Sequence, residues 1–146
     1  MTVVISLAGL FGALAAAATV DLKLKPGKYA LTVTYEVQDQ RQNQSRSATR
    51  CIRPRDLNNP EKIFDDRVVA TPKEEDACSV RNLRTANRQV SYDADCSNRT
   101  VHVEGTLSDG GFSVIRTVTP KGNQGVSLKF MVSGRRTGDC LPLGER

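Results

Sequence analysis

The stretch CSVRNLRTANRQVSYDADC, residues 78–96, begins and ends in cysteine and has the turn-prone Asn87 at its middle. Residues that face each other across an antiparallel hairpin lie at equal distances from its turn, so this stretch places a turn at residues 86–88. The pairs that follow are Cys78 with Cys96, Val80 with Ala94, and Asn82 with Tyr92. Opposed residues share one face of a sheet at a separation that a disulfide can bridge. The stretch therefore predicts a hairpin closed by a Cys78–Cys96 disulfide.

The other two cysteines, Cys51 and Cys140, are then left to each other. Zinc sites use closely spaced cysteine pairs, which are missing here, and His102 is the only histidine. We therefore expect two disulfides, no metal site and an oxidising compartment. In the chain-entropy model the Cys51–Cys140 disulfide, which closes a long loop, stabilises the folded state by about 4–5 kcal/mol, and the hairpin disulfide by about 3 kcal/mol.

Residues 1–18, MTVVISLAGLFGALAAAA, have no charged side chain and end in small residues. This pattern is typical of a secretory signal peptide, although no basic region precedes it. The alternative is a membrane anchor, but the apolar run reaches only about the minimum spanning length. We expect a mature protein that begins between Ala16 and Val20, without a membrane span, in the periplasm or secreted, with residues 19–146 as one domain.

The 21 basic and 16 acidic residues all follow residue 18, so the mature chain keeps the net charge of +5. The basic residues are scattered rather than clustered on one predicted face, and aromatic side chains for base stacking are few. Examples of this scatter are Arg41, Arg46, Arg50, Arg53 and Arg55. Charges spread over edges and loops favour solubility over nucleic-acid binding.

Alternating apolar and polar residues predict a sheet in most of the mature chain. In LKLKPGKYALTVTYEVQ, residues 22–38, Pro26–Gly27 is a turn, and the alternation from Lys28 to Gln38 after it is the clearest strand. SRSATRCIR, residues 45–53, is a weaker second one. RPRDLNNPEKIF, residues 53–64, reads as a loop with one short helix. In that helix Asn58 or Asn59 would be the cap and Pro60 the first helical residue.

The C-terminal half of the chain predicts further hairpins. An Asp109–Gly110 turn pairs Leu107 with Phe112. The last strand, VSLKFMVSG at residues 126–134, puts Val126, Leu128, Phe130 and Val132 on one face. About seven antiparallel strands result, and we expect an all-β meander, curled into a half-barrel or closed into a small barrel.

Three motifs, read together with the cysteines, resemble a known family. They are KPGKY at residues 25–29, CIRPRD at residues 51–56 and GRRTGDC at residues 134–140. In this order the chain resembles the bacterial family catalogued as domain of unknown function 3617, over nearly all of residues 20–140. The resemblance implies a small, exported, cysteine-paired protein of the periplasm or outer surface, and it implies no catalytic residues. The chain departs from the family in having Tyr29 where tryptophan is usual, and in lacking methionine-rich stretches.

Catalytic patterns are weak in this sequence. A Ser-His-Asp triad would need His102, which strand parity points toward solvent, and no Gly-x-Ser-x-Gly elbow occurs. Asp93 and Asp95 share an outward strand face, an arrangement that suits a calcium ion or a glycosidase pair, but nothing else converges on them. We therefore expect no enzyme activity and no cofactor.

Arg116 is the residue that breaks the strand pattern, because it falls on the face of Phe112, Val114 and Val118. We expect a bulge near Ile115 to turn it outward; the alternative is that it anchors a ligand. Arg135 and Arg136, beside Cys140, are the other candidate contacts for a ligand or partner, unless they pair with Asp56 or Asp139. The function expected is a non-catalytic interaction or binding module whose partner is an envelope protein. The alternative is a carrier of a small apolar ligand inside a curled sheet.

Overall fold

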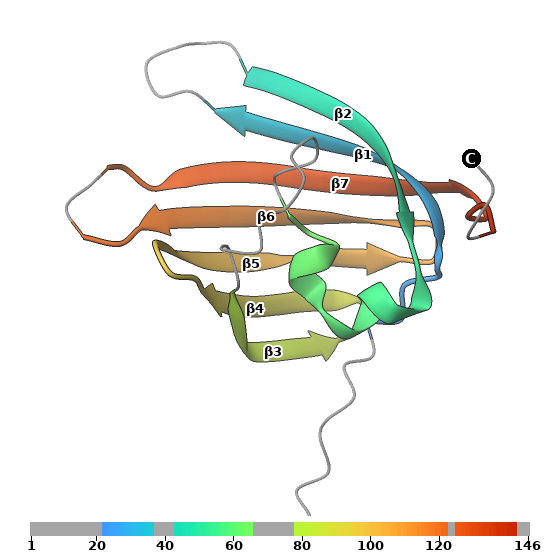
Figure 1. Cartoon of the computed structure of the whole chain (residues 1–146), viewed down its shortest axis with the longest axis horizontal. Coiled ribbons are helices and arrows are strands. Elements are labelled where there is room, and N and C mark those ends of the chain that lie inside the picture. The colour runs from blue at the N-terminus through green and yellow to red at the C-terminus, as the bar shows by residue number, and fades with distance from the viewer. Residues whose placement is uncertain (1–21, 37–42, 66–77, 123–124, 143–146) are drawn as a thin grey trace, which may run out of the picture.

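One antiparallel sheet of seven strands makes up most of the structure (Figure 1), a computed structural model that describes residues 22–36, 43–65, 78–122 and 125–142. The strands are β1 (Gly27–Glu36), β2 (Asn43–Ile52), β3 (Ser79–Ala86), β4 (Gln89–Asp95), β5 (Arg99–Ser108), β6 (Gly111–Pro120) and β7 (Leu128–Gly138). Two short 3₁₀ helices, η1 (Pro54–Asn58) and η2 (Pro60–Lys62), follow β2. The prediction of an all-β, antiparallel, seven-stranded fold is confirmed. The signal peptide predicted at residues 1–18 lies outside the described residues.

The sheet is curled but open, with the strand order β2-β1-β7-β6-β5-β4-β3. Neighbours in the sequence are neighbours in the sheet except β2 and β3, which form its two edges, while β1 pairs with β7. The small closed barrel that we considered therefore does not form. After β2 the chain leaves the edge through η1 and η2, which lie over the concave face of the sheet (Figure 1).

The β3–β4 hairpin has the predicted disulfide, Cys78–Cys96, but not the predicted register throughout. Val80 faces Ala94 as expected, and the register then shifts between Arg81 and Arg84. The expected pairing of Asn82 with Tyr92 is wrong, because Asn82 adopts a left-handed φ of 56° at this bulge. An extra residue in β3 was not visible in a stretch whose cysteines are symmetrically placed.

The β5–β6–β7 region follows the predicted pairing more closely. Leu107 faces Phe112 around the Asp109–Gly110 turn, and the β5–β6 and β6–β7 registers run without a shift past Arg116. The strand β7 begins at Leu128, so Val126 lies outside it. Its predicted apolar face is buried only toward the C-terminus, since Val132 is fully buried whereas Leu128 is 46% exposed.

The short helix predicted at residues 53–64 forms as two 3₁₀ turns instead. Asn59 caps η2 as predicted, because its side-chain oxygen accepts a hydrogen bond of 3.0 Å from the Glu61 amide. Pro60 disfavours helical geometry in the residue before it, and Asn59 is accordingly extended at φ −136° and ψ 104°. The proline therefore separates η1 from η2.

The core lies between the concave face and the N-terminal and 3₁₀ segments that cover it. Strands β1, β4, β5, β6 and β7 all contribute buried side chains, and Leu22, Leu24, Ile63 and Phe64 pack onto them. Phe64 contacts both Tyr92 and Phe112, at ring-centroid distances of 6.4 and 5.0 Å. The second predicted disulfide, Cys51–Cys140, joins the end of β2 to the segment after β7. In the described ranges no helix is long and apolar enough to cross a membrane.

Candidate functional site

Arg116 is the most deeply buried charged side chain of the described residues, with no solvent exposure. It forms two hydrogen bonds to Glu61, one of 2.6 Å from Nη1 to Oε1 and one of 3.0 Å from Nη2 to Oε2. The hydroxyl of Tyr92 donates a third hydrogen bond of 2.6 Å to Glu61 Oε1. The Glu61 side chain is 10% exposed. A bidentate pair of this kind neutralises a guanidinium that would otherwise be costly to bury.

Three separate elements position this cluster. The η2 turn carries Glu61 over the concave face, while β4 and β6 present Tyr92 and Arg116 from below. Burial, and then the nearby Glu61 carboxylate, raise the pKa of Tyr92 well above its ordinary value, so its hydroxyl stays a hydrogen-bond donor. The cluster therefore ties the 3₁₀ segment to the sheet.

The bulge that we expected near Ile115 is wrong, since the register is continuous and Arg116 points into the core. The carboxylate that compensates Arg116 comes from Glu61, which is 55 residues away in sequence. Sequence reasoning missed this partner because strand periodicity carries no information about what crosses the face of a sheet. The only available signal was that a buried arginine requires an acid. Whether Arg116 also contacts a ligand stays a prediction.

The three sequence motifs meet in one corner of the fold. Arg136 Nε donates a hydrogen bond of 3.0 Å to the Pro26 carbonyl, and its guanidinium also pairs with Asp139. Arg136 crosses so closely over Gly27 that a Cβ atom there would collide with it. The Cys51–Cys140 disulfide closes the same corner. The motifs thus have a structural explanation.

The other two candidate arginines are separated from Arg116. Arg135 is exposed and faces Gly111 at the far end of β6, and Arg136 is held in the motif corner. Of the pairings expected for them, Arg136 with Asp139 is the one that forms. The structure therefore does not bring the predicted contact residues into one site.

His102 lies on the outer face of the sheet, as strand parity predicts, with its side chain 49% exposed. Its Nδ1 lies 2.7 Å from Asp93 Oδ1, and its Nε2 lies 3.7 Å from Glu104. The hydrogen bond with Asp93 is the main cause that raises the pKa of His102. Hydrogen bonds from Asn82 and then His102 lower the pKa of Asp93. Within the ranges that the structure covers, no group of three or more acidic, histidine or cysteine side chains could hold a metal ion.

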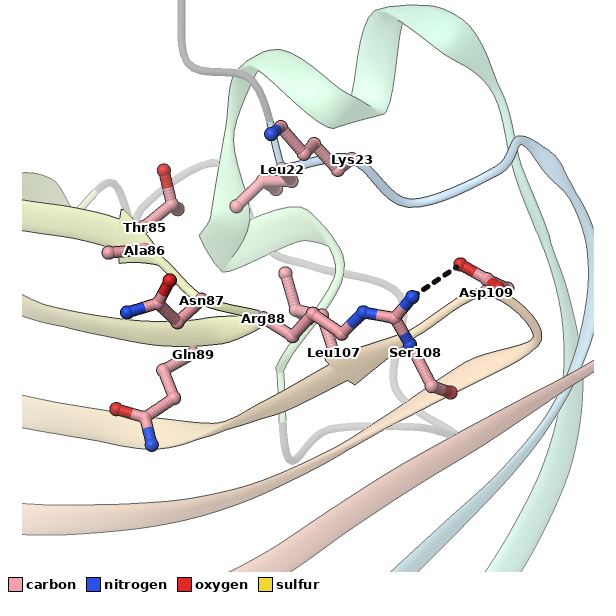
Figure 2. Close-up of a pocket in the computed structure, with 10 residues that line it drawn as sticks. All are labelled: Leu22, Lys23, Thr85, Ala86, Asn87, Arg88, Gln89, Leu107, Ser108 and Asp109. Carbon is pink, nitrogen blue, oxygen red and sulfur yellow. Dashed lines mark ion pairs between the residues drawn. The ribbon is translucent and has the colours of Figure 1, made fainter.

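A pocket of about 410 Å³ lies at one end of the sheet (Figure 2). It sits between the N-terminal segment, the β3–β4 turn and the β5–β6 turn, and its apolar lining residues are Leu22, Ala86 and Leu107. Arg88 reaches from one turn to Asp109 on the other at 3.6 Å, and these side chains are 69% and 95% exposed. Because its rim is so exposed, this pocket would leave much of a bound ligand in water.

The outer face carries a second, wider hollow of about 650 Å³ across β3 to β7. Ile115 and Met131 face each other across β6 and β7 there, 43% and 51% exposed. Polar side chains such as Ser91, Glu104 and Ser113 surround them. Two apolar side chains on a polar face are common at protein surfaces and do not by themselves define a partner.

The edge strand β2 presents a different kind of surface. Opposed residues in antiparallel strands point to the same face, and Arg46, Ala48 and Arg50 face the buried residues Val33, Leu31 and Tyr29 of β1. The two arginines are therefore on the concave side of the edge. Arg46 is exposed, and Ala48 and Arg50 are half-buried. The sequence placed these arginines on edges and loops but did not show that they share a face with the core.

The model of a family described as "Protein of unknown function (DUF3617)" matches residues 24–140 of the chain. The matched region includes all seven strands, both disulfides and the Arg116–Glu61–Tyr92 cluster. No curated protein and no solved structure matches the chain significantly.

Proposed function

This chain belongs to the DUF3617 family of proteins of unknown function, and from that premise we propose that it is a non-catalytic binding module of the cell envelope. It contacts a partner protein through exposed sheet surface rather than by enclosing a small ligand. The two disulfides support an address outside the cytoplasm, because such bonds persist in oxidising compartments.

The observation that carries this proposal is the filled concave face of an open sheet. A carrier would need an apolar cavity inside the curl. Here that space is occupied by the chain's own Phe64, Tyr92 and Arg116, each with an exposed fraction of 1% or less. Among the described strands, β2 is an edge strand that pairs with β1 alone. A filled concave face together with the β2 edge favours binding through the surface of the sheet over enclosure of a ligand inside it.

The geometry around His102 supports a function without catalysis. A serine-type triad needs a carboxylate at one imidazole nitrogen and a nucleophilic hydroxyl at the other. In this structure Nδ1 faces Asp93 and Nε2 faces the carboxylate of Glu104. The histidine therefore lies between two acids on an exposed surface.

Site-specific photo-crosslinking in the native host tests the proposal. The crosslinking amino acid replaces Ser47, which is exposed on β2, or Ser97, an exposed control after β4. We expect crosslinks to a defined envelope protein from position 47 and none from position 97, and an N-terminus between Ala16 and Val20. No crosslink at 47, together with stoichiometric release of an apolar compound by organic extraction, would establish the carrier alternative instead.

A further inference from the structure

The two edges of the sheet differ in how well they could accept another strand. The edge strand β3 has eight residues and a register shift at Asn82, a bulge of the kind that blocks edge pairing. The edge strand β2 has ten residues in unbroken register with β1. In the described part of the chain, residues 43–51 form no backbone hydrogen bonds outside the sheet. The β2 edge is therefore the one suited to strand addition.

Three side chains of β2 decide which strand would fit. Arg46, Ala48 and Arg50 alternate along the concave side of the edge, and the two arginines lie ~13 Å apart at the rise of an extended strand. The sequence of β2, NQSRSATRCI, has no acidic residue. Among the residues described, no carboxylate lies within ion-pair distance of Arg46 or Arg50. The edge thus offers two cations with a short apolar side chain between them.

A second copy of this chain fits the edge poorly in the register that would align the two β2 strands on their central alanine. An antiparallel pairing of β2 with itself, centred on Ala48, would set Arg46 of one copy opposite Arg50 of the other. Like charges directly opposite each other destabilise a strand pair. The same geometry attracts a strand that carries acids at the two opposing positions.

We infer that β2 binds an extended acidic segment of the partner by strand addition, an inference that rests on the proposed binding function. Side chains on one face of a strand recur at every second residue. The segment therefore carries an acid, any residue, an apolar residue, any residue and a second acid. Its acids face Arg46 and Arg50, and its central apolar residue covers Ala48 and adds to the concave face.

A short blocked peptide with the core Glu-Thr-Val-Thr-Glu tests this inference against full-length mature protein with intact disulfides. The control peptide, Thr-Glu-Val-Glu-Thr, has the same composition, but its acids are too close together to face both arginines. We expect the first peptide to bind, to slow hydrogen exchange of β2 amides but not β3 amides, and to weaken with added salt. Equal binding of both peptides, or protection of β3, would overturn the inference.

Charge reversal supplies the matched variants. Arg46→Glu with Arg50→Glu should weaken binding of the acidic peptide by about tenfold or more, whereas Arg84→Glu on the opposite edge should leave it unchanged. The doubly reversed variant should instead bind Lys-Thr-Val-Thr-Lys, a rescue that an unfolded variant could not show. The inference would be contradicted if the doubly reversed variant bound the acidic peptide with wild-type affinity, or if the protein self-associated through β2. If position 47 still crosslinks to an envelope protein while these peptides fail, the partner chemistry is wrong and the binding function stands.

Discussion

Removal of the Arg116 guanidinium should be among the most destabilising changes at the buried contact between the 3₁₀ segment and the sheet. Arg116→Met removes the bidentate partner of the Glu61 carboxylate, which is only 10% exposed. The carboxylate then keeps only its hydrogen bond from the Tyr92 hydroxyl. Breaking a buried ion pair from one side typically costs 3–5 kcal/mol, and we expect about that loss in the free energy of unfolding. For a domain of this size the loss lowers Tm by on the order of 10 °C.

A double-mutant cycle separates the pair from the packing around it. Glu61→Gln keeps an acceptor for Tyr92 but removes the charge, and the double variant should cost at least about 1 kcal/mol less than the sum of the single changes. Urea unfolding with disulfides intact measures the cycle, followed by circular dichroism because the chain has no tryptophan. Arg84→Met, at an exposed position of β3, is the control and should change stability by less than about 0.5 kcal/mol. A loss below about 1 kcal/mol for Arg116→Met, or strict additivity, would refute the buried-pair reasoning.

Three further changes have expected outcomes. A Cβ atom at Gly134 would lie 2.6 Å from Phe112 Cζ, so Gly134→Ala should cost about 1–3 kcal/mol in urea unfolding, while Gly110→Ala, with nothing within 4 Å, should be nearly neutral. Loss of the Cys51–Cys140 disulfide should destabilise more than loss of the hairpin disulfide, because it spans 89 residues rather than 18; equal losses would contradict the loop-entropy account. His102→Ala should leave crosslinking at position 47 unchanged. The pKa of His102 is raised in the folded protein, so its protonated form stabilises the fold by a small amount, below about 1 kcal/mol. The wild-type protein should lose this stabilisation as the pH rises from about 6.5 through the folded pKa, and the stability of the His102→Ala variant should not change over the same range.

The sequence alone was sufficient for features that depend on local periodicity and on the chain's cysteines. Period-two alternation identified the strands, and the Asp109–Gly110 turn identified the β5–β6 register. The equal distances of Cys78 and Cys96 from Asn87 identified one disulfide, and elimination then identified the other. These predictions succeeded because strand pairing across a tight turn is determined by residues close together in sequence.

Only the tertiary structure decided how the sheet is completed and what covers it. The sheet would close into a barrel only if β2 paired with β3, but β2 pairs with β1 and β3 pairs with β4. The burial of Arg116 likewise depends on its ion pair with Glu61, which η2 positions over the concave face. The bulge at Asn82 was also hidden: next to the turn Ala86 faces Gln89, and only the extra residue in β3 brings the strands into the register of the Cys78–Cys96 disulfide. Non-local packing determines the open edges and the burial of Arg116, because a buried charge or a free edge is stable only in relation to groups that distant segments supply.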